Sequence, residues 1–307
     1  MPSAGRRPTF LVIGAYKAGT TSIHHYLKQH PQVFMSRIKE IRFLAYAGHQ
    51  QVPLSAVQKA ALQWPVRSLA DYEALFDQAA NHQARGDVSP CYLAYAKQSI
   101  VGIKTYVPQA KLIVVLRHPA DRAYSSYTYI VNLGREAELD FRRAVHRELD
   151  NGGPRTDGRQ HHYLAENLYF DFLRQYFQQF PREQIQVHLY DDLIRDGSGL
   201  MKNIFRFIGV DDTFTPNTSK QLNTAAWSRV PFTPPVTRKV EHMALRLIQR
   251  LPDPLGERLA KGFMRLIWTR PPPLDPAIRH QLTQIFREDI LKVQDLIGRD
   301  LSSWLKG

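Results

Sequence analysis

Hydrophobic residues occur along the chain in short blocks. Residues 10–13 form a continuous apolar run followed by Gly14, and residues 111–116 form a longer run rich in β-branched side chains. Runs of this length without polar interruptions predict strands that are buried on both faces. Three further segments are weaker strand candidates: residues 33–35, 85–87 and 185–190.

Between these runs, apolar residues recur at helical spacing. Ile23, Tyr26 and Leu27 predict a helix that starts near Thr21 and stops before Pro31, because proline cannot continue a helix. The same spacing predicts helices within residues 50–83, after Pro119, and over residues 164–180, 201–208 and about 276–297. The alternation of strand and helix predicts an α/β fold with three layers. Its centre is a roughly five-stranded parallel sheet, flanked by helices on both faces.

The chain of 307 residues is 43% hydrophobic, enough to bury a sizeable core. We expect residues 1–8 to be a disordered lead and residues 9–307 to form a single domain. The apolar run at residues 10–13 is too short for a signal peptide or a membrane span, which favours a cytoplasmic protein. The chain has one cysteine, Cys91, and its two pairs of adjacent histidines lack the spacing of metal ligands. No metal site is predicted.

Lysine and arginine exceed acidic residues by 13, which indicates an anionic partner. The excess is largest between residues 220 and 270, where proline clusters at 231–235 and 271–276 flank two basic amphipathic helices. We expect a basic helical insertion at about residues 236–270. It could pack on the domain with its charges solvated, contact an anionic membrane as a peripheral surface, or cover an acceptor cleft.

Residues 14–21 (GAYKAGTT) lie between the first strand and the first helix. Two glycines five residues apart allow the backbone to curl round an anion, and the start of the helix adds partial positive charge. A Walker A loop needs lysine directly after the second glycine, but Thr20 stands there and the lysine is Lys17. The strand at 111–116 is followed by Arg117, not by a carboxylate that could hold magnesium. This pattern predicts a phosphate site built on lysine and arginine.

Two nucleotide-binding motifs carry a resemblance to a known family. Residues 10–22 (FLVIGAYKAGTTS) resemble the 5′-phosphosulfate loop of sulfotransferases that use 3′-phosphoadenosine 5′-phosphosulfate (PAPS), above all bacterial enzymes related to the heparan sulfate sulfotransferase domains. Residues 115–127 (VLRHPADRAYSSY) resemble their 3′-phosphate motif. Shorter matches occur at residues 39–43 (KEIRF), 87–92 (DVSPCY), 189–193 (LYDDL) and 298–305 (GRDLSSWL). The two nucleotide motifs, in this order and at this separation, are a specific signal.

The resemblance implies roles for the residues of these motifs. The sulfonate and the 5′-phosphate would lie in a cradle formed by Lys17, Ala18, Gly19, Thr20, Thr21 and Ser22. Lys17 would stabilise the charge that develops on the leaving phosphate, adenosine 3′,5′-bisphosphate being the product. Arg117 and Ser125 would hold the 3′-phosphate, because a planar guanidinium matches two phosphate oxygens. The alternative for Arg117 is a salt bridge with Asp121.

The resemblance also implies that Glu40 is the general base that takes the proton from the acceptor. The alternative is a solvated partner of Lys39 or Arg42. Arg42 stands where some members of the wider family carry histidine. Asp87 could assist the base or orient the acceptor, or it could be a turn carboxylate at a strand end.

We therefore expect a sulfotransferase that moves a sulfuryl group by in-line displacement. Its acceptor would be a hydroxyl or amine on a small molecule, a glycan or a lipid. Two rival functions remain open: a nucleotide kinase on the same scaffold, and a non-catalytic protein that binds an anionic ligand. No nucleic-acid-binding motif is present, so no nucleic-acid partner is expected. The oligomeric state cannot be predicted.

Overall fold

Five strands form a wholly parallel central sheet in the order β2-β3-β1-β4-β5. The strands are β1 (Phe10–Gly14), β2 (Val33–Met35), β3 (Ala84–Val88), β4 (Lys111–Leu116) and β5 (Ile185–Leu189). Leu11 is paired with Asp87 on one side and with Leu112 on the other. The predicted α/β class and the five-stranded parallel sheet are confirmed. Since β1 is central and the chain crosses it between β3 and β4, the edge where β1 and β4 end is a topological switch point.

The computed structural model describes residues 6–51, 65–79, 82–151, 163–219 and 268–306, together with the short pieces 227–228, 243–244, 259 and 262. A two-stranded antiparallel ladder joins β6 (Trp227–Ser228) to β7 (Trp268–Thr269). Most of the predicted basic insertion at residues 236–270 lies outside the described residues, as do residues 1–5. Within the predicted lead, Arg7 donates from Nη1 to the carbonyl of Tyr106 (3.0 Å) and from Nε to Glu73 (2.8 Å).

Helices connect the strands and continue after the last one. The α-helices are α1 (Thr20–Leu27), α2 (Phe43–His49), α4 (Leu69–Ala74), α5 (Cys91–Ala94), α6 (Ala96–Tyr106), α7 (Pro119–Asn132), α8 (Phe141–Asp150), α9 (Tyr169–Gln179), α10 (Tyr190–Arg195), α11 (Gly197–Ile208) and α14 (Pro276–Ile297). Short 3-10 helices are η1 (Asp77–Ala79), η2 (Ala165–Asn167), η3 (Arg182–Gln184) and η4 (Ser302–Leu305). None of the described helices has the length and apolar composition needed to cross a membrane.

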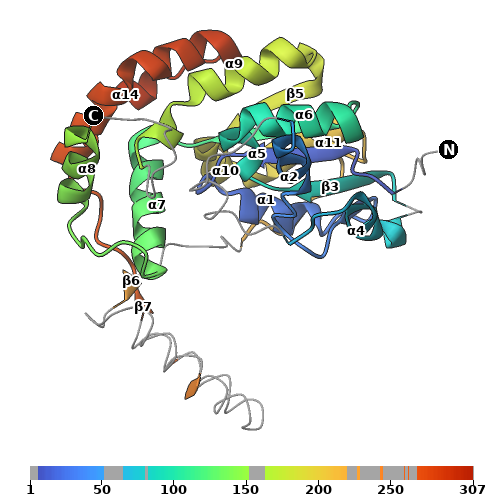
Figure 1. Cartoon of the computed structure of the whole chain (residues 1–307), viewed down its shortest axis with the longest axis horizontal. Coiled ribbons are helices and arrows are strands. Elements are labelled where there is room, and N and C mark those ends of the chain that lie inside the picture. The colour runs from blue at the N-terminus through green and yellow to red at the C-terminus, as the bar shows by residue number, and fades with distance from the viewer. Residues whose placement is uncertain are drawn as a thin grey trace.

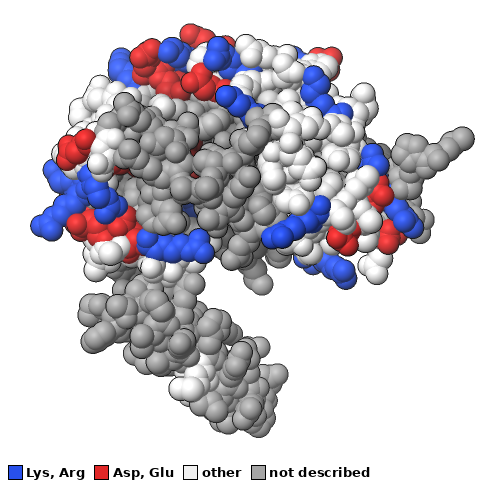
Figure 2. Space-filling view, viewed as in Figure 1, with Lys and Arg blue, Asp and Glu red and all other residues white. Residues whose placement is uncertain are grey.

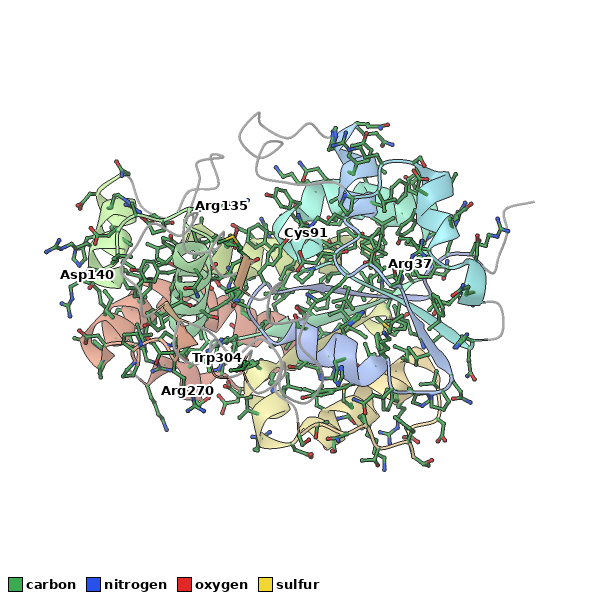
Figure 3. All side chains as sticks on the ribbon, turned by 90° about the horizontal axis from the view of Figure 1, so that it is seen from below. Arg37, Cys91, Arg135, Asp140, Arg270 and Trp304 are labelled. Atoms are coloured by element: carbon green, nitrogen blue, oxygen red, sulfur yellow. The ribbon has the colours of Figure 1, made fainter. Side chains whose placement is uncertain are left out.

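The helices form a layer on each face of the sheet. Helices α2, α5, α6 and α9 pack on one another, and α5 also packs against β1. Helix α1 packs with α11, which contacts β4. In the view of Figure 3, α1 and α11 lie on one side of the strands, and α2 and α6 lie on the opposite side. Helix α14 runs beside α9 and also contacts α7 (Figure 1).

The C-terminal part of the described chain is anchored beside the end of β4. Trp304 is buried and lies beside the C-terminal helix α14 (Figure 3). Its indole N–H donates to Asp191 (2.8 Å), and its carbonyl lies 2.9 Å from Nε2 of His118. Nδ1 of His118 accepts the N–H of Ala120 (3.2 Å), so Nε2 carries the proton that is donated to Trp304. Residue 304 is thereby tied to the turn that follows Arg117.

Several helices differ from the sequence-based expectation. The helix expected over residues 164–180 begins only at Tyr169, because Asp289 of α14 accepts the N–H groups of Tyr169 (2.9 Å) and Phe170 (3.1 Å) and caps it there. Within residues 50–83 the described helices are only α4 and η1. The helices α2, α5, α6, α8 and α10 were not predicted.

Charges of both signs are mixed on the described surface. In the view of Figure 2, Lys and Arg lie beside Asp and Glu over α8 and α14. Exposed examples are the pairs Arg142–Asp275 (2.7 Å) and Lys292–Glu288 (2.5 Å). The positive excess of the sequence is thus not gathered into one continuous patch on the part of this face that the structure describes.

Helices α2 and α6 cross at glycines. A Cβ at Gly102 would lie 2.0 Å from the carbonyl oxygen of Leu44, and one at Gly48 would lie 1.8 Å from the carbonyl oxygen of Gln98. Both obstacles are main-chain atoms, so a rotamer change cannot relieve the overlap. This contact holds α2, which directly follows Glu40 and Arg42, tightly against α6.

The substitution Gly102→Ala is therefore expected to separate α2 from α6 and to destabilise the fold by about 1–3 kcal/mol. Gly197→Ala is the matched control, because its added Cβ would meet only Thr218, at 3.4 Å, in the first turn of α11. Urea unfolding followed by circular dichroism measures both free energies. Equal stability of the two variants would contradict the proposed close packing.

Candidate functional site

The loop after β1 is shaped by a glycine at the start of α1. Gly19 is the N-cap residue and has a left-handed backbone with φ of 88°. A Cβ there would also lie 2.7 Å from Leu193 and 3.0 Å from Tyr190. Only glycine meets both constraints without strain. The following residues Thr20 and Ser22 are buried, so the first turn of α1 begins in the interior at the switch point of the sheet.

Lys17 is the central cation of this loop. Its φ of 62° places a non-glycine residue in the left-handed region, which is stable only when the surroundings hold it there. Its ammonium lies 4.3 Å from the centre of the Tyr129 ring on α7. Burial, and then the charges of Arg117 and Lys39, lower the pKa of Lys17 to about 8. The free protein therefore keeps this charge at a cost, which a bound anion would remove.

Arg117 follows β4 and is in direct contact with the same loop. Its Nη1 donates to the carbonyl of Lys17 (3.2 Å), and its guanidinium lies 4.7 Å from the centre of the Tyr190 ring. The alternative salt bridge with Asp121 is wrong, because Asp121 is paired with Arg279 (3.1 Å). The two cations predicted to hold opposite ends of one nucleotide thus meet at one edge of the sheet.

Ser125 lies in α7 and is half-buried. It stands four residues before Tyr129, and Ser126 stands three residues before it, so both serines lie near the helix face that carries Tyr129. Because Tyr129 contacts Lys17, the face of α7 that carries Ser125 is directed toward the loop.

Glu40 lies beside the end of β3, where its N–H donates to the carbonyl of Val88 (2.9 Å). Its carboxylate is paired with Lys39 (3.2 Å) and with Arg42. Burial acts to raise the pKa of Glu40, but Lys39 and Arg42 outweigh burial and lower it. The carboxylate is therefore ionised and able to accept a proton, although its partners make it a weak base. The alternative prediction was that Glu40 is a solvated partner of Lys39 or Arg42. The pairing is present in the structure, but the Glu40 side chain is only 26% exposed and is therefore not freely solvated.

Arg42 connects Glu40 to the start of α2. It is the N-cap residue of that helix, with a φ of 63°, and its N–H donates to Ser89 (3.1 Å). Burial acts against the charge on Arg42, but the neighbouring Tyr16 and Glu40 raise its pKa. This arginine thus holds Glu40 in place.

Asp87 belongs to the core. Its side chain is fully buried and accepts hydrogen bonds from Ser89 (2.7 Å), Tyr92 (2.7 Å) and Tyr72 (3.2 Å). Burial raises its pKa to about 6, although the three hydroxyl groups oppose this. With its oxygens occupied by internal donors, Asp87 fits the alternative of a structural carboxylate at a strand end.

Sequence reasoning missed four residues of this region. Lys39 lies within the motif at residues 39–43, but the sequence did not indicate its role. Tyr129 could have been predicted as a neighbour of the loop from its spacing of four residues to Ser125. Tyr190 comes into contact with Arg117 only because β5 pairs with β4. Arg122, which contacts the loop from α7, also received no role. Among the described residues, no three His, Cys, Asp or Glu side chains are grouped as metal ligands.

Known proteins resemble this chain in sequence and in fold. The sequence profile described as the Sulfotransferase family matches residues 8–215. A solved sulfotransferase from Alicyclobacillus acidocaldarius is 27% identical, with a TM-score of 0.70, over 97% of this chain and 98% of that one. The chain therefore belongs to the sulfotransferase family.

Curated relatives are larger proteins. The human bifunctional heparan sulfate N-deacetylase/N-sulfotransferase 3 is 24% identical over 98% of this chain and 31% of its own length. Rat carbohydrate sulfotransferase 15 is 25% identical over 66% of this chain and 44% of its own length. The chain thus spans about a third to less than half of these relatives.

Because the pKa of Lys17 is lowered, we expect that replacing this lysine stabilises the folded protein. Lys17→Met should raise the free energy of unfolding by about 1–3 kcal/mol at pH 7, because a buried charge beside other cations is removed. The unfolded chain binds this proton up to a pKa near 10.5 and the folded protein only up to about 8. The gain is thus complete below pH 8 and shrinks as the pH rises from 8 to 10.5.

Chemical denaturation at pH 7 and pH 10 measures this difference. Lys28→Met is the matched control, since Lys28 is an exposed lysine at the end of the same helix. A loss of stability in Lys17→Met at pH 7, relative to the wild type, would refute the cost assigned to the Lys17 charge.

Proposed function

We propose that the chain transfers the sulfuryl group of PAPS to a hydroxyl or amine of an acceptor molecule. The observation that carries the proposal is the contact between Lys17 and Arg117 at the switch point, where β1 and β4 end. Two cations that approach one sheet edge from different strands suit a ligand with two separate phosphate groups. No carboxylate stands at the end of β4, as it would in a magnesium-dependent phosphoryl-transfer enzyme.

In this proposal the donor lies across the carboxyl ends of the strands. Its 5′-phosphosulfate occupies the cradle of Lys17, Ala18, Gly19, Thr20, Thr21 and Ser22, where the start of α1 supplies partial positive charge. Its 3′-phosphate is held by Arg117 and Ser125. The Tyr190 ring, whose centre lies 4.7 Å from the guanidinium of Arg117, supports this role because the contact restricts where that side chain can lie.

The transfer is an in-line displacement at sulfur. A lone pair of the acceptor forms the new bond to sulfur while the bond from sulfur to the bridging oxygen breaks, and that electron pair stays on the 5′-phosphate. Lys17 stabilises this developing charge; loss of one such contact typically costs about 2.7–4 kcal/mol. Glu40 takes the acceptor proton, and its ion pairs with Lys39 and Arg42 keep it deprotonated beforehand.

A glycan is the favoured acceptor class. The named relatives include a heparan sulfate N-sulfotransferase and a carbohydrate sulfotransferase, which is the reason for preferring a glycan over a lipid or a small molecule. Whether oxygen or nitrogen receives the sulfuryl group depends on the acceptor. Both nucleophiles deliver one proton to a carboxylate base.

Ligand-induced stabilisation tests the nucleotide part of the proposal. Adenosine 3′,5′-bisphosphate at about 100 times its Kd, without magnesium, should stabilise the protein by about 2.7 kcal/mol, seen as a rise in melting temperature. Lys17→Met should lose most of this shift and Lys28→Met should keep it. A shift only with ATP and magnesium would instead support the rival nucleotide kinase.

Replacement of the base should separate binding from transfer. Glu40→Gln should retain bisphosphate affinity, because the removed charge is negative, but should lower transfer about 10²- to 10⁴-fold. The assay uses labelled PAPS with a panel of glycan, lipid and small-molecule acceptors and reads products by mass spectrometry. The exposed Glu183→Gln serves as control. Transfer by Glu40→Gln within threefold of the wild type would remove Glu40 from the mechanism.

A further inference from the structure

Two arginines bind consecutive main-chain carbonyls of the phosphate loop. Arg117 donates to the carbonyl of Lys17 (3.2 Å), and Arg122 donates from Nη1 to the carbonyl of Tyr16 (3.3 Å). Arg117 is proposed above as a ligand of the nucleotide. Arg122 has no such role and lies one turn into α7, with its side chain only 2% exposed.

The guanidinium of Arg122 has further partners inside the protein. Its Nε donates to Asn167 (2.5 Å) and its Nη2 to Glu166 (3.3 Å), and the group lies 5.6 Å from the centre of the Tyr169 ring. Asn167 is itself held, because its amide donates to the carbonyl of Tyr163. A buried charge with this many partners has one orientation, so the remaining Nη1 can act as a rigid support for the loop.

The hydrogen bond from Arg122 to the carbonyl of Tyr16 determines the orientation of the peptide between Tyr16 and Lys17. The peptide between Tyr16 and Lys17 is planar and trans, so its C=O and N–H point in opposite directions. With the carbonyl of Tyr16 directed at Arg122, the N–H of Lys17 is directed away from Arg122. The same contact holds Tyr16, the residue before Lys17. Lys17 itself has a left-handed φ of 62°, which needs support from its surroundings.

We propose that Arg122 is a positioning residue that holds the loop in the form that receives the 5′-phosphosulfate. It acts through the main chain of Tyr16 and contacts no part of the nucleotide itself. The inference rests on the proposed function, since it assumes that the loop binds the 5′ end of the donor. It predicts that loss of Arg122 weakens recognition of the 5′ end and leaves recognition of the 3′ end unchanged.

Two nucleotides separate these ends in an experiment. Isothermal titration compares adenosine 3′,5′-bisphosphate with adenosine 3′-monophosphate, which lacks the 5′ phosphate, at a temperature well below the melting transition. In Arg122→Met the Kd of the bisphosphate should rise about 10- to 100-fold, the range for loss of a charged hydrogen bond. The Kd of the monophosphate should stay within twofold of the wild type. Arg122→Lys, which keeps the charge, should recover part of the bisphosphate affinity.

Arg7→Met is the matched control. Arg7 likewise binds a main-chain carbonyl and a carboxylate, but it precedes β1 and thus lies at the opposite edge of the sheet. Its loss should leave the Kd of both nucleotides within twofold. If Arg122→Met does not fold, Asn167→Ser removes the anchor of Arg122 and should shift the same ratio of the two Kd values in the same direction.

The outcomes distinguish the inference from the function on which it rests. Failure of the wild type to bind the bisphosphate would refute the proposed function. A wild type that binds, with equal losses for both nucleotides in the Arg122 variants or with no loss at all, would overturn the positioning role and leave the proposed function intact.

Discussion

One hydrogen bond joins the two parts of the chain that are proposed to hold phosphate groups. Arg117, at the end of β4, donates to the carbonyl of Lys17 in the loop after β1. The contact requires β1 and β4 to be parallel neighbours, as their register from Phe10 and Lys111 makes them. Helix α7 then closes the arrangement, because it follows Arg117 and brings Tyr129 to the ammonium of Lys17. The strand order and the α7 contact thus bring Lys17, Arg117 and Tyr129 together at one edge of the sheet.

The region around this edge has an excess of positive charge. Lys17, Lys39, Arg42 and Arg117 lie near one another, and Glu40 is paired with two of them. Cations in a partly buried site repel one another and are poorly solvated, so their charges are held at a cost. A ligand that brings several negative charges would relieve this repulsion, as the proposed donor with phosphate at both ends would do.

Much of this arrangement could be predicted from short segments of sequence. A strand covered on both faces must be apolar, which is why Lys111–Leu116 is recognisable, and a phosphate loop carries its glycines and its lysine within a few residues. The partners of Arg122 could not be predicted, because Asn167 lies 45 positions further along the chain. The left-handed backbone at Glu40 and Arg42 was equally hidden, since neither residue type favours it. Sequence patterns report local requirements, whereas these features depend on tertiary contacts.

The anchoring of Trp304 has a consequence for how the protein assembles during synthesis. His118, next to Arg117, binds the carbonyl of a residue that is 186 positions later in the chain. The ribosome makes a protein from its N-terminus, so β1 and β4 are complete long before this partner exists. The turn after β4 therefore spends most of translation without its final neighbour. The contact between His118 and Trp304 therefore forms late in synthesis, long after Lys17 and Arg117 have been made.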